Sequence, residues 1–223
     1  MRDRKDYFVI GGVFFALLVM ALIGFLTTST VRLRTEKLTA EIELMKSERL
    51  IYDLTNENER LHYIRDLSVE FNLSPMVVLL VDHFSSEICC DDYEAFRLIQ
   101  TPEFLTFIAL SVIHAESGGN VNAIGDSGKA LGLTQLHLPT ARDYEDVSRD
   151  QLFIPETNIR IFFSHFVSLL KHYRGNVALA LYSWNRGRSR VDNLISYGLD
   201  PSNEFGFKVY EASIRANGGR NFD

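Results

Sequence analysis

The first thirty residues show an uninterrupted apolar run instead of an alternation of apolar and polar positions. No charged residue lies between Tyr7 and Val31, and the segment FVIGGVFFALLVMALIGFL is 19 residues long. A helix needs about 20 apolar residues to cross a hydrocarbon core about 30 Å thick. The apolar part of a cleaved signal peptide is shorter, about 7–15 residues. The run therefore predicts a transmembrane helix over residues 7–28, behind a short tail of residues 1–6; the alternative is a buried helix of a soluble protein.

Beyond this span the apolar residues recur at spacings of three, four and seven. Such spacings predict one long amphipathic helix over residues 29–72, with Glu and Lys on its other faces. This stalk could pair with a second copy as a short coiled coil, but the apolar seam breaks near residues 55–58, which favours a monomeric or docked helix. The apolar positions are Leu38, Ile42, Met45, Leu50, Leu54, Leu61, Ile64 and Leu67.

A second helix is predicted within the lead-in segment, residues 73–100. Ser74 is a good N-cap and Pro75 suits the first helical position. The segment that follows, MVVLLVDHF, is apolar on most faces, so we expect it to pack into the globular part.

The globular part, residues 101–223, has the pattern of a mainly α-helical domain. Thr101 and Pro102 open a helix, EFLTFIALSVIHAES, that is apolar around nearly its whole circumference and is therefore predicted to be buried. Further helices are predicted near residues 156–174, 176–186 and 204–216. The segment NAIGDSGKALGLTQL could hold a small β ribbon or hairpin.

Charge and composition exclude some classes of function. A formal net charge of −6 gives no support to nucleic-acid binding, which requires a basic face. The two cysteines are adjacent, and the histidines show no ligand spacing, so no metal site and no cofactor are predicted. These residues are Cys89, Cys90, His114, His137, His165 and His172.

Glu116 is the candidate for chemistry, because it lies at the C-terminal end of the buried helix, just before Ser117-Gly118-Gly119. The partial negative charge of a helix C-terminus disfavours a second negative charge there. Apolar surroundings act in the same direction, since desolvation raises the pKa of a carboxyl. We therefore predict a carboxyl that keeps its proton near neutral pH, as a general acid for a glycosidic oxygen requires. The alternative is an ordinary solvated glutamate near a helix end.

Two further segments supply groups that suit a sugar ring. The glycine-bearing turn SGKALGLTQ ends in Gln135, whose amide both donates and accepts hydrogen bonds. The segment LYSWNRG brings Tyr182, Trp184 and Asn185 to the end of another helix. Aromatic faces pack against the C–H faces of a sugar, and amides bind its hydroxyls. We predict that these four residues contact substrate.

Residues 104–195 resemble the catalytic domain of soluble-type lytic transglycosylases, lysozyme-like enzymes that cut bacterial peptidoglycan. The Glu-Ser pair of this family appears as Glu116-Ser117. Its Ser-x-x-Ala-x-Gly-Leu-Met-Gln element appears as SGKALGLTQ, with Thr134 in place of Met, and is followed by LPTA. The stretch FIPETNIR is similar to the family's Phe-x-Pro-x-x-Asn-Ile.

The last motif of the resemblance departs from the family pattern. The Ala-Tyr-Asn-x-Gly motif is matched by LALYSWNRG, interpreted with Ser183-Trp184 inserted between Tyr182 and Asn185. Either aromatic residue could then fill the motif's aromatic slot. The family commonly has a tyrosine late in the domain, within Tyr-Val-x-Lys-Val. The corresponding segment here is FGFKV, which begins with phenylalanine, so the tyrosine hydroxyl would come from Tyr210 or be absent.

The resemblance implies a lysozyme-like helical domain, which would follow the single transmembrane helix predicted from the apolar run, and one carboxyl with two tasks. Glu116 would protonate the oxygen between N-acetylmuramic acid and N-acetylglucosamine, and its carboxylate would then help the muramic 6-hydroxyl attack the anomeric carbon. The product is a 1,6-anhydro end, formed without a cofactor. Ser117 and Tyr210 join the predicted substrate contacts.

The resemblance also implies a location, because the glycan strand lies outside the cytoplasm. The N-terminus would be cytoplasmic and the domain would face the periplasm or cell wall, although the charges that flank the span are nearly balanced. The expected partners are the glycan strand, the membrane and, through the stalk, a second copy or a wall-spanning machine.

Two other functions compete with this assignment. A hydrolytic muramidase usually needs a second carboxylate, and Asp126 in IGDSGK is the nearby candidate, although aspartate is also common in such turns. An inactive wall-binding scaffold is disfavoured because Glu116 is present.

Overall fold

The computed structural model describes residues 4–91 and 101–216, without the side chains of residues 4–16, 21 and 89–91, so Cys89 and Cys90 lie outside the described side chains. The chain divides into two compact units, Met1–Arg60 and Leu61–Asp223.

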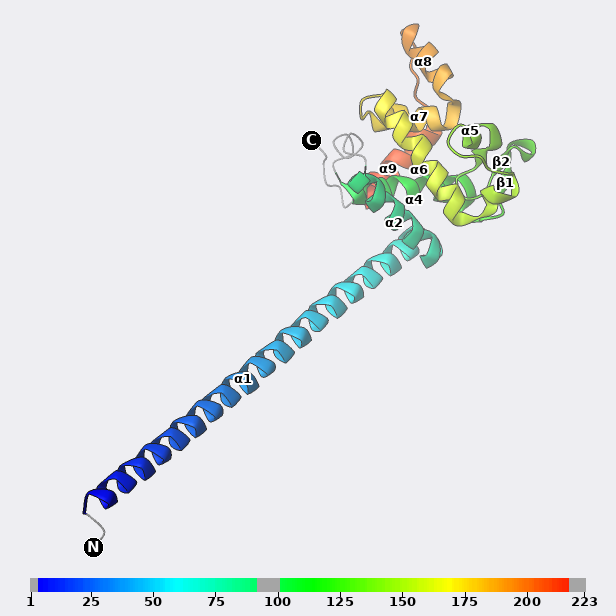
Figure 1. The fold of residues 1–223 in the computed structure, drawn as a ribbon. Helices are drawn as coiled ribbons and strands as arrows, with labels where there is room; N and C mark the ends of the chain where they lie inside the picture. Colours follow the sequence, from blue (N-terminus) through cyan, green and yellow to red (C-terminus); the bar gives the residue numbers. More distant parts are fainter. Residues whose placement is uncertain (1–3, 92–100, 217–223) are drawn as a thin grey trace. The chain divides into compact units, whose positions relative to one another are not determined.

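Over its described residues, 4–60, the first unit is one helix. Helix α1 spans Arg4–Glu70 without interruption, so helix formation is confirmed across both N-terminal segments (Figure 1). Within the described residues, α1 is the one helix whose length and composition would allow it to cross a membrane. The apolar side chains of its described N-terminal part, such as Leu18, Met20 and Phe25, are exposed.

The second unit begins at Leu61, well before the expected domain start at residue 101. The last turns of α1 and the helix after it supply core side chains, because their apolar residues pack against the globular helices. The lead-in helix thus packs into the globular part, as predicted, and the core also includes the end of the predicted stalk. The buried residues concerned are Ile64, Leu67, Phe71, Leu73, Val77, Val78, Val81 and Phe84.

The second unit is mainly helical, which confirms the predicted class. The predicted helices all form, and α8, which no apolar pattern predicted, follows Gly187 directly. The helices are α2 (Pro75–Asp91), α4 (Pro102–Ser117), α5 (Leu138–Arg142), α6 (Pro155–His172), α7 (Val177–Arg186), α8 (Arg188–Ser196) and α9 (Glu204–Ala216).

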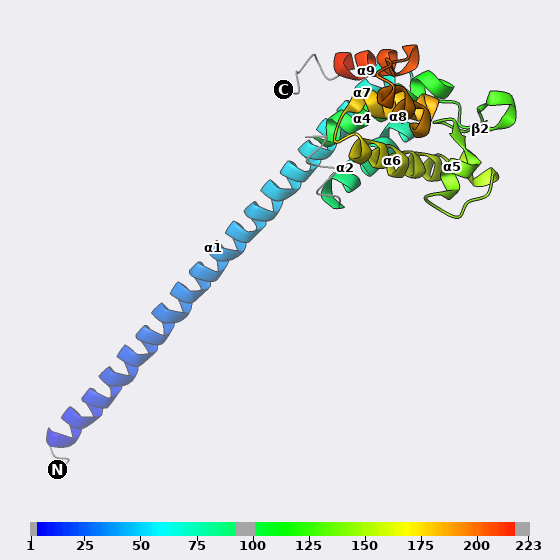
Figure 2. The same ribbon diagram turned by 90° about the horizontal axis from the view of Figure 1, so that it is seen from above.

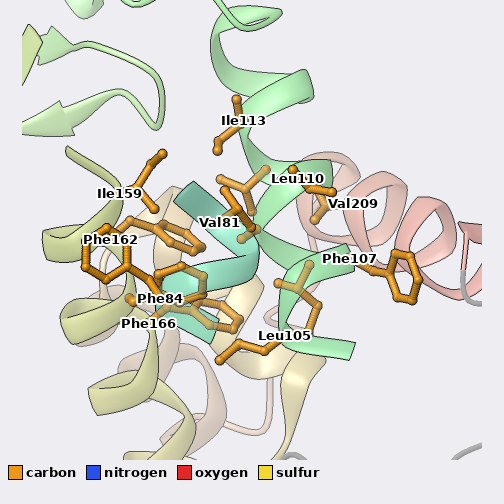
Figure 3. Packing of buried hydrophobic residues seen from close by; sticks show 14 of the residues in the cluster. Val81, Phe84, Leu105, Phe107, Leu110, Ile113, Ile159, Phe162, Phe166 and Val209 are labelled. Carbon is orange, nitrogen blue, oxygen red and sulfur yellow. The ribbon is translucent and has the colours of Figure 1, made fainter. Parts of the chain in front are cut away.

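Helix α4 lies at the centre of this unit. Every residue from Phe104 to Ile113 is buried, as the apolar circumference predicted. Helices α2 and α9 pack on α4, while α6 packs on α2 and α7 (Figure 2). Figure 3 shows side chains from α2, α4, α6 and α9 meeting in one cluster. Within it, the rings of Phe162 and Phe166 of α6 are stacked, with their centroids 5.5 Å apart.

A small β sheet forms in the glycine-rich segment after α4. Strands β1 (Ile124–Gly125), β2 (Ala130–Leu131) and β3 (Leu136–His137) pair antiparallel in that order. A short 3-10 helix, Asp126–Gly128, joins β1 to β2, and another, Asp150–Phe153, precedes α6. The predicted ribbon is therefore present as a three-stranded sheet.

Candidate active site

The end of α4 places Glu116 at the edge of the core. Thr101 caps the start of the helix, where its Oγ1 accepts a hydrogen bond from the amide of Phe104 at 3.3 Å. Gly118 closes the other end in the left-handed region (φ 59°), with its N–H donated to the carbonyl of His114. A glycine fits this C-cap because it has no Cβ to strain. The buried helix thus stops one turn after the core and leaves Glu116 partly buried.

The Glu116 carboxyl has a raised pKa, so it keeps its proton up to about neutral pH. Burial raises its pKa from 4.5 to about 7, and a hydrogen bond from Trp184 lowers the pKa only in part. The indole Nε1 of Trp184 donates this bond to Oε1 of Glu116 at 3.1 Å. Desolvation therefore outweighs the donor, and a proton is available near neutral pH.

Trp184, and not Tyr182, is the aromatic residue against Glu116. The Trp184 ring lies edge-on to Phe162 at 4.8 Å between centroids and tilted against His165 at 5.3 Å. Helix α7 is continuous through this segment. SWNRG then aligns with Ala-Tyr-Asn-x-Gly without a gap, with Trp184 in the tyrosine position. This corrects the expected insertion of Ser183-Trp184.

Tyr182 and Asn185 have different surroundings. The Tyr182 ring packs against Gly206 of α9, where a Cβ would collide with it, and its carbonyl accepts a bond from Asn203 Nδ2 at 3.3 Å. Tyr182 therefore joins α7 to α9. Asn185 is exposed, one residue after Trp184 on α7.

Gln135 braces the turn before β3. Its backbone lies in the left-handed region (φ 52°), and its Nε2 donates to the carbonyls of Ala123 at 3.2 Å and Gly132 at 2.9 Å. The amide N–H groups of Gln135 are thus used within the loop that carries the sheet.

Ser117 and Tyr210 are also engaged in the fold. Ser117 Oγ donates to the carbonyl of Ile113 and accepts from the amide of Gly119, both at 3.2 Å. Its side chain thus satisfies backbone groups at the C-terminal end of α4. Tyr210 of α9 packs, partly buried, against the larger core cluster. The structure thus gives both residues a structural contact beside the predicted substrate contact.

Asn158, on α6, is the asparagine of the FIPETNIR stretch, for which no role was predicted; it fixes the sheet side of the site. It is fully buried, and its Nδ2 donates to the carbonyls of Leu131 and Leu152 at 3.0 and 2.8 Å. Its Oδ1 accepts from the amide and the hydroxyl of Thr134 at 3.0 and 2.7 Å. Thr134 is thus a hydrogen-bond partner where the family pattern has Met. Gly132 has φ 74°, and a Cβ there would meet both Leu152 and Asn158.

Asp126 lies in the predicted turn. It begins the 3-10 helix with φ 44°, and its carboxylate oxygen is 3.4 Å from Nε2 of His137. More than half of its side chain is exposed. The Asp126 carboxylate therefore belongs to the turn and lies beside His137.

Among the described residues, no group of three or more His, Cys, Asp or Glu could hold a metal ion. The arrangement at Glu116 is that of a single acid, desolvated by the core and oriented by one indole.

These features define a lysozyme-like helical domain with a small sheet beside one buried acid. Residues 96–203 match the family model described as Transglycosylase SLT domain. The match agrees with the motifs: this part of the chain, just under half of its length, is similar to the SLT domain.

Two solved structures are similar to this chain. One is the 70 kDa soluble lytic transglycosylase SLT70 from Escherichia coli, with 24% identity over 48% of this chain and 19% of that protein, and a TM-score of 0.40. The other is an inactive mutant of the lytic transglycosylase Slt from Pseudomonas aeruginosa, with 23% identity over 56% of this chain and 21% of that protein, and a TM-score of 0.39. The chain thus spans about a fifth of each of these proteins.

Proposed function

We propose that this protein is a membrane-anchored lytic transglycosylase of peptidoglycan. The observation that carries the proposal is the pair of Glu116 and Trp184: a carboxyl with a pKa of about 7, oriented by an indole N–H at 3.1 Å. The SLT family match supports the substrate, a glycan strand of alternating N-acetylmuramic acid and N-acetylglucosamine.

The hydrogen bond from Trp184 determines which oxygen of Glu116 carries the proton. An indole N–H donates and cannot accept, so Oε1 is an acceptor in both protonation states. The carbonyl oxygen of a protonated carboxyl is a better acceptor than its hydroxyl oxygen, so this bond favours the acidic proton on Oε2. In this mechanism Oε2 is the atom that approaches the glycosidic oxygen.

The reaction has two proton transfers and consumes no water. Oε2–H protonates the oxygen that leaves with N-acetylglucosamine, and the bond from that oxygen to C1 of the muramic residue breaks. The carboxylate, stabilised by the Trp184 N–H, then accepts the proton of the muramic 6-hydroxyl while O6 bonds to C1. The acid returns to its starting form, and the product is the 1,6-anhydro end.

The observation against a hydrolase is the setting of Asp126. A muramidase of the two-carboxylate kind needs a second carboxylate to act as nucleophile or to activate water. Asp126 is largely exposed and paired with His137. The site thus favours attack by the substrate's own hydroxyl.

We expect Asp126→Asn to reduce turnover by no more than about threefold, since the change removes a turn carboxylate and no catalytic base. Release of soluble fragments from purified sacculi measures this. A loss of about a hundredfold or more, the size of a missing acid–base group, would favour the hydrolase.

The anchor is proposed from exposed apolar side chains on α1. Leu18, Met20 and Phe25 are each more than 65% exposed, which is unfavourable in water. The hydroxyls of Thr28 and Thr30 donate to the carbonyls of Gly24 and Leu26 at 2.9 and 2.7 Å, so they need no water. Both features suit a helix in a lipid bilayer. We further propose that the N-terminus is cytoplasmic and that the exposed apolar positions of the stalk serve self-association.

Truncation separates the anchor from the domain. We expect residues 61–223 to be soluble without detergent and active, because that unit contains its own core. Residues 73–223 should be less stable by several kcal/mol, since Ile64, Leu67 and Phe71 are lost from the core. Urea denaturation compares the two forms. Equal midpoints would show that the end of α1 adds no stability to the domain. The anchor is tested separately: a full-length chain that stays soluble without membranes or detergent would contradict it.

A further inference from the structure

Two residues of α6 hold the Trp184 ring. Phe162 meets it edge-on, and His165, one helical turn later, meets it at 46° between the ring planes. Residues three apart lie on the same face of a helix, so both reach Trp184 from one side. The ring whose N–H orients Glu116 is therefore itself oriented from α6.

His165 is in turn fixed by a residue outside the core. The hydroxyl of Tyr144 is 2.8 Å from Nδ1 of His165, and their rings are 5.3 Å apart and tilted by 55°. Burial lowers the pKa of His165 to about 4; Asp143 opposes this shift and Arg188 adds to it. The imidazole is thus neutral across the working pH range and presents an uncharged ring to the indole.

A plain apolar side chain would fill the same space without fixing an angle. The bond to Tyr144 restricts rotation of the imidazole, and the tilted contact transmits that restriction to the indole. A shift of the Trp184 ring by an ångström would lengthen a hydrogen bond of 3.1 Å beyond its useful range.

We propose that His165 is a positioning residue for the acid: with Tyr144, it clamps the Trp184 indole so that its N–H stays on Oε1 of Glu116. The proposal rests on the proposed function, in which Oε2 of Glu116 transfers its proton to the glycosidic oxygen. None of the motifs that resemble the SLT family contains His165 or Tyr144.

The protein offers an internal probe, because Trp184 is its only tryptophan. Fluorescence of the full chain in detergent therefore reports this one ring. In His165→Leu, which keeps apolar volume, we expect more acrylamide quenching and lower anisotropy of Trp184. Tyr144→Phe, which loses only an exposed hydroxyl, should change the quenching and the anisotropy in the same direction as His165→Leu, but to a smaller extent. His83→Ala, at an exposed histidine of α2, should change neither.

Kinetics on sacculi give the second readout. His165→Leu should lower kcat roughly tenfold or more and leave KM within about twofold, since positioning and not binding is lost. The alkaline limb of its pH profile should move upward, because the Trp184 bond that lowers the Glu116 pKa is weakened. Trp184→Phe should cause the same upward shift, and adding His165→Leu to it should cause no further shift.

An unchanged alkaline limb in His165→Leu, or effects that add fully to those of Trp184→Phe, would overturn the clamp. A wild-type protein that releases no anhydro ends would instead overturn the proposed function, and the mobility of Trp184 would then decide the clamp alone. Unchanged quenching in both His165→Leu and Tyr144→Phe would refute it in that case.

Discussion

Glu116→Gln is expected to remove nearly all turnover, by about 10²–10⁴-fold, because an amide has no acidic proton to give. The fold should persist, since glutamine has nearly the same shape and its carbonyl oxygen can accept the Trp184 bond now made by Oε1. Turbidity clearing of purified peptidoglycan measures the loss. Near wild-type clearing by the variant would remove Glu116 from the mechanism.

The same variant should change how stability depends on pH. The folded pKa of Glu116, about 7, is raised above its ordinary value of 4.5. The contribution of this carboxyl to stability is therefore full below about pH 4.5 and is lost as pH rises through about 7. The loss is of the order of 3 kcal/mol at 1.36 kcal/mol per pKa unit. Glutamine carries no such penalty.

We therefore expect Glu116→Gln to unfold at a higher temperature than the wild type at pH 8 and at a similar temperature at pH 4.5. Wild-type kcat/KM should fall as pH rises through about 7, since the acid form is required. Calorimetry at the two pH values and a pH–rate profile check both statements. A variant less stable than the wild type at pH 8 would contradict burial of the charge.

Asn158→Leu is expected to cause the largest loss of stability. Leucine has a similar volume but leaves the amide and hydroxyl of Thr134 and the carbonyls of Leu131 and Leu152 without their partner. Each stranded buried group costs about 1–3 kcal/mol, so the total should reach at least roughly 3 kcal/mol. Because these bonds tie the sheet to α6, activity should fall as well.

Urea denaturation of residues 61–223 measures the effect of Asn158→Leu. The matched control is Asn193→Leu on α8, where the side chain is exposed and the change should stay within about 0.5 kcal/mol. Equal midpoints for Asn158→Leu and the wild type would show that the network contributes no net stability.

The burial of Glu116 and its place at a helix end could be predicted from the sequence because its surroundings are local. The apolar run of α4 and the glycines after it define both the burial and the helix end within twenty residues. The position of Trp184 could not be predicted in this way. Tyr182 and Trp184 are two residues apart on α7, about 200° around a helix of 3.6 residues per turn, so only one can face Glu116. Which one does so depends on how α7 packs.

The roles of Asn158, which belongs to the FIPETNIR motif, and of His165 were missed for a related reason. Their partners are distant in sequence: Asn158 bonds Thr134 and Leu131, and His165 contacts Tyr144 and Trp184. Within α6 each is simply a polar residue among apolar ones. That the end of α1, from Leu61, joins the core could not be predicted, because the apolar spacing after the break near residues 55–58 suits an exposed amphipathic helix as well as a packed one.

The measurement that tests the central claim most directly is mass spectrometry of the muropeptides that residues 61–223 release from purified sacculi. The proposed mechanism uses the muramic 6-hydroxyl, so the released chains should end in 1,6-anhydro-muramic acid, lighter than a hydrolysed end by one water molecule. Glu116→Gln should release almost none. Reducing ends as the main product of the wild type would contradict the account and identify the protein as a hydrolase.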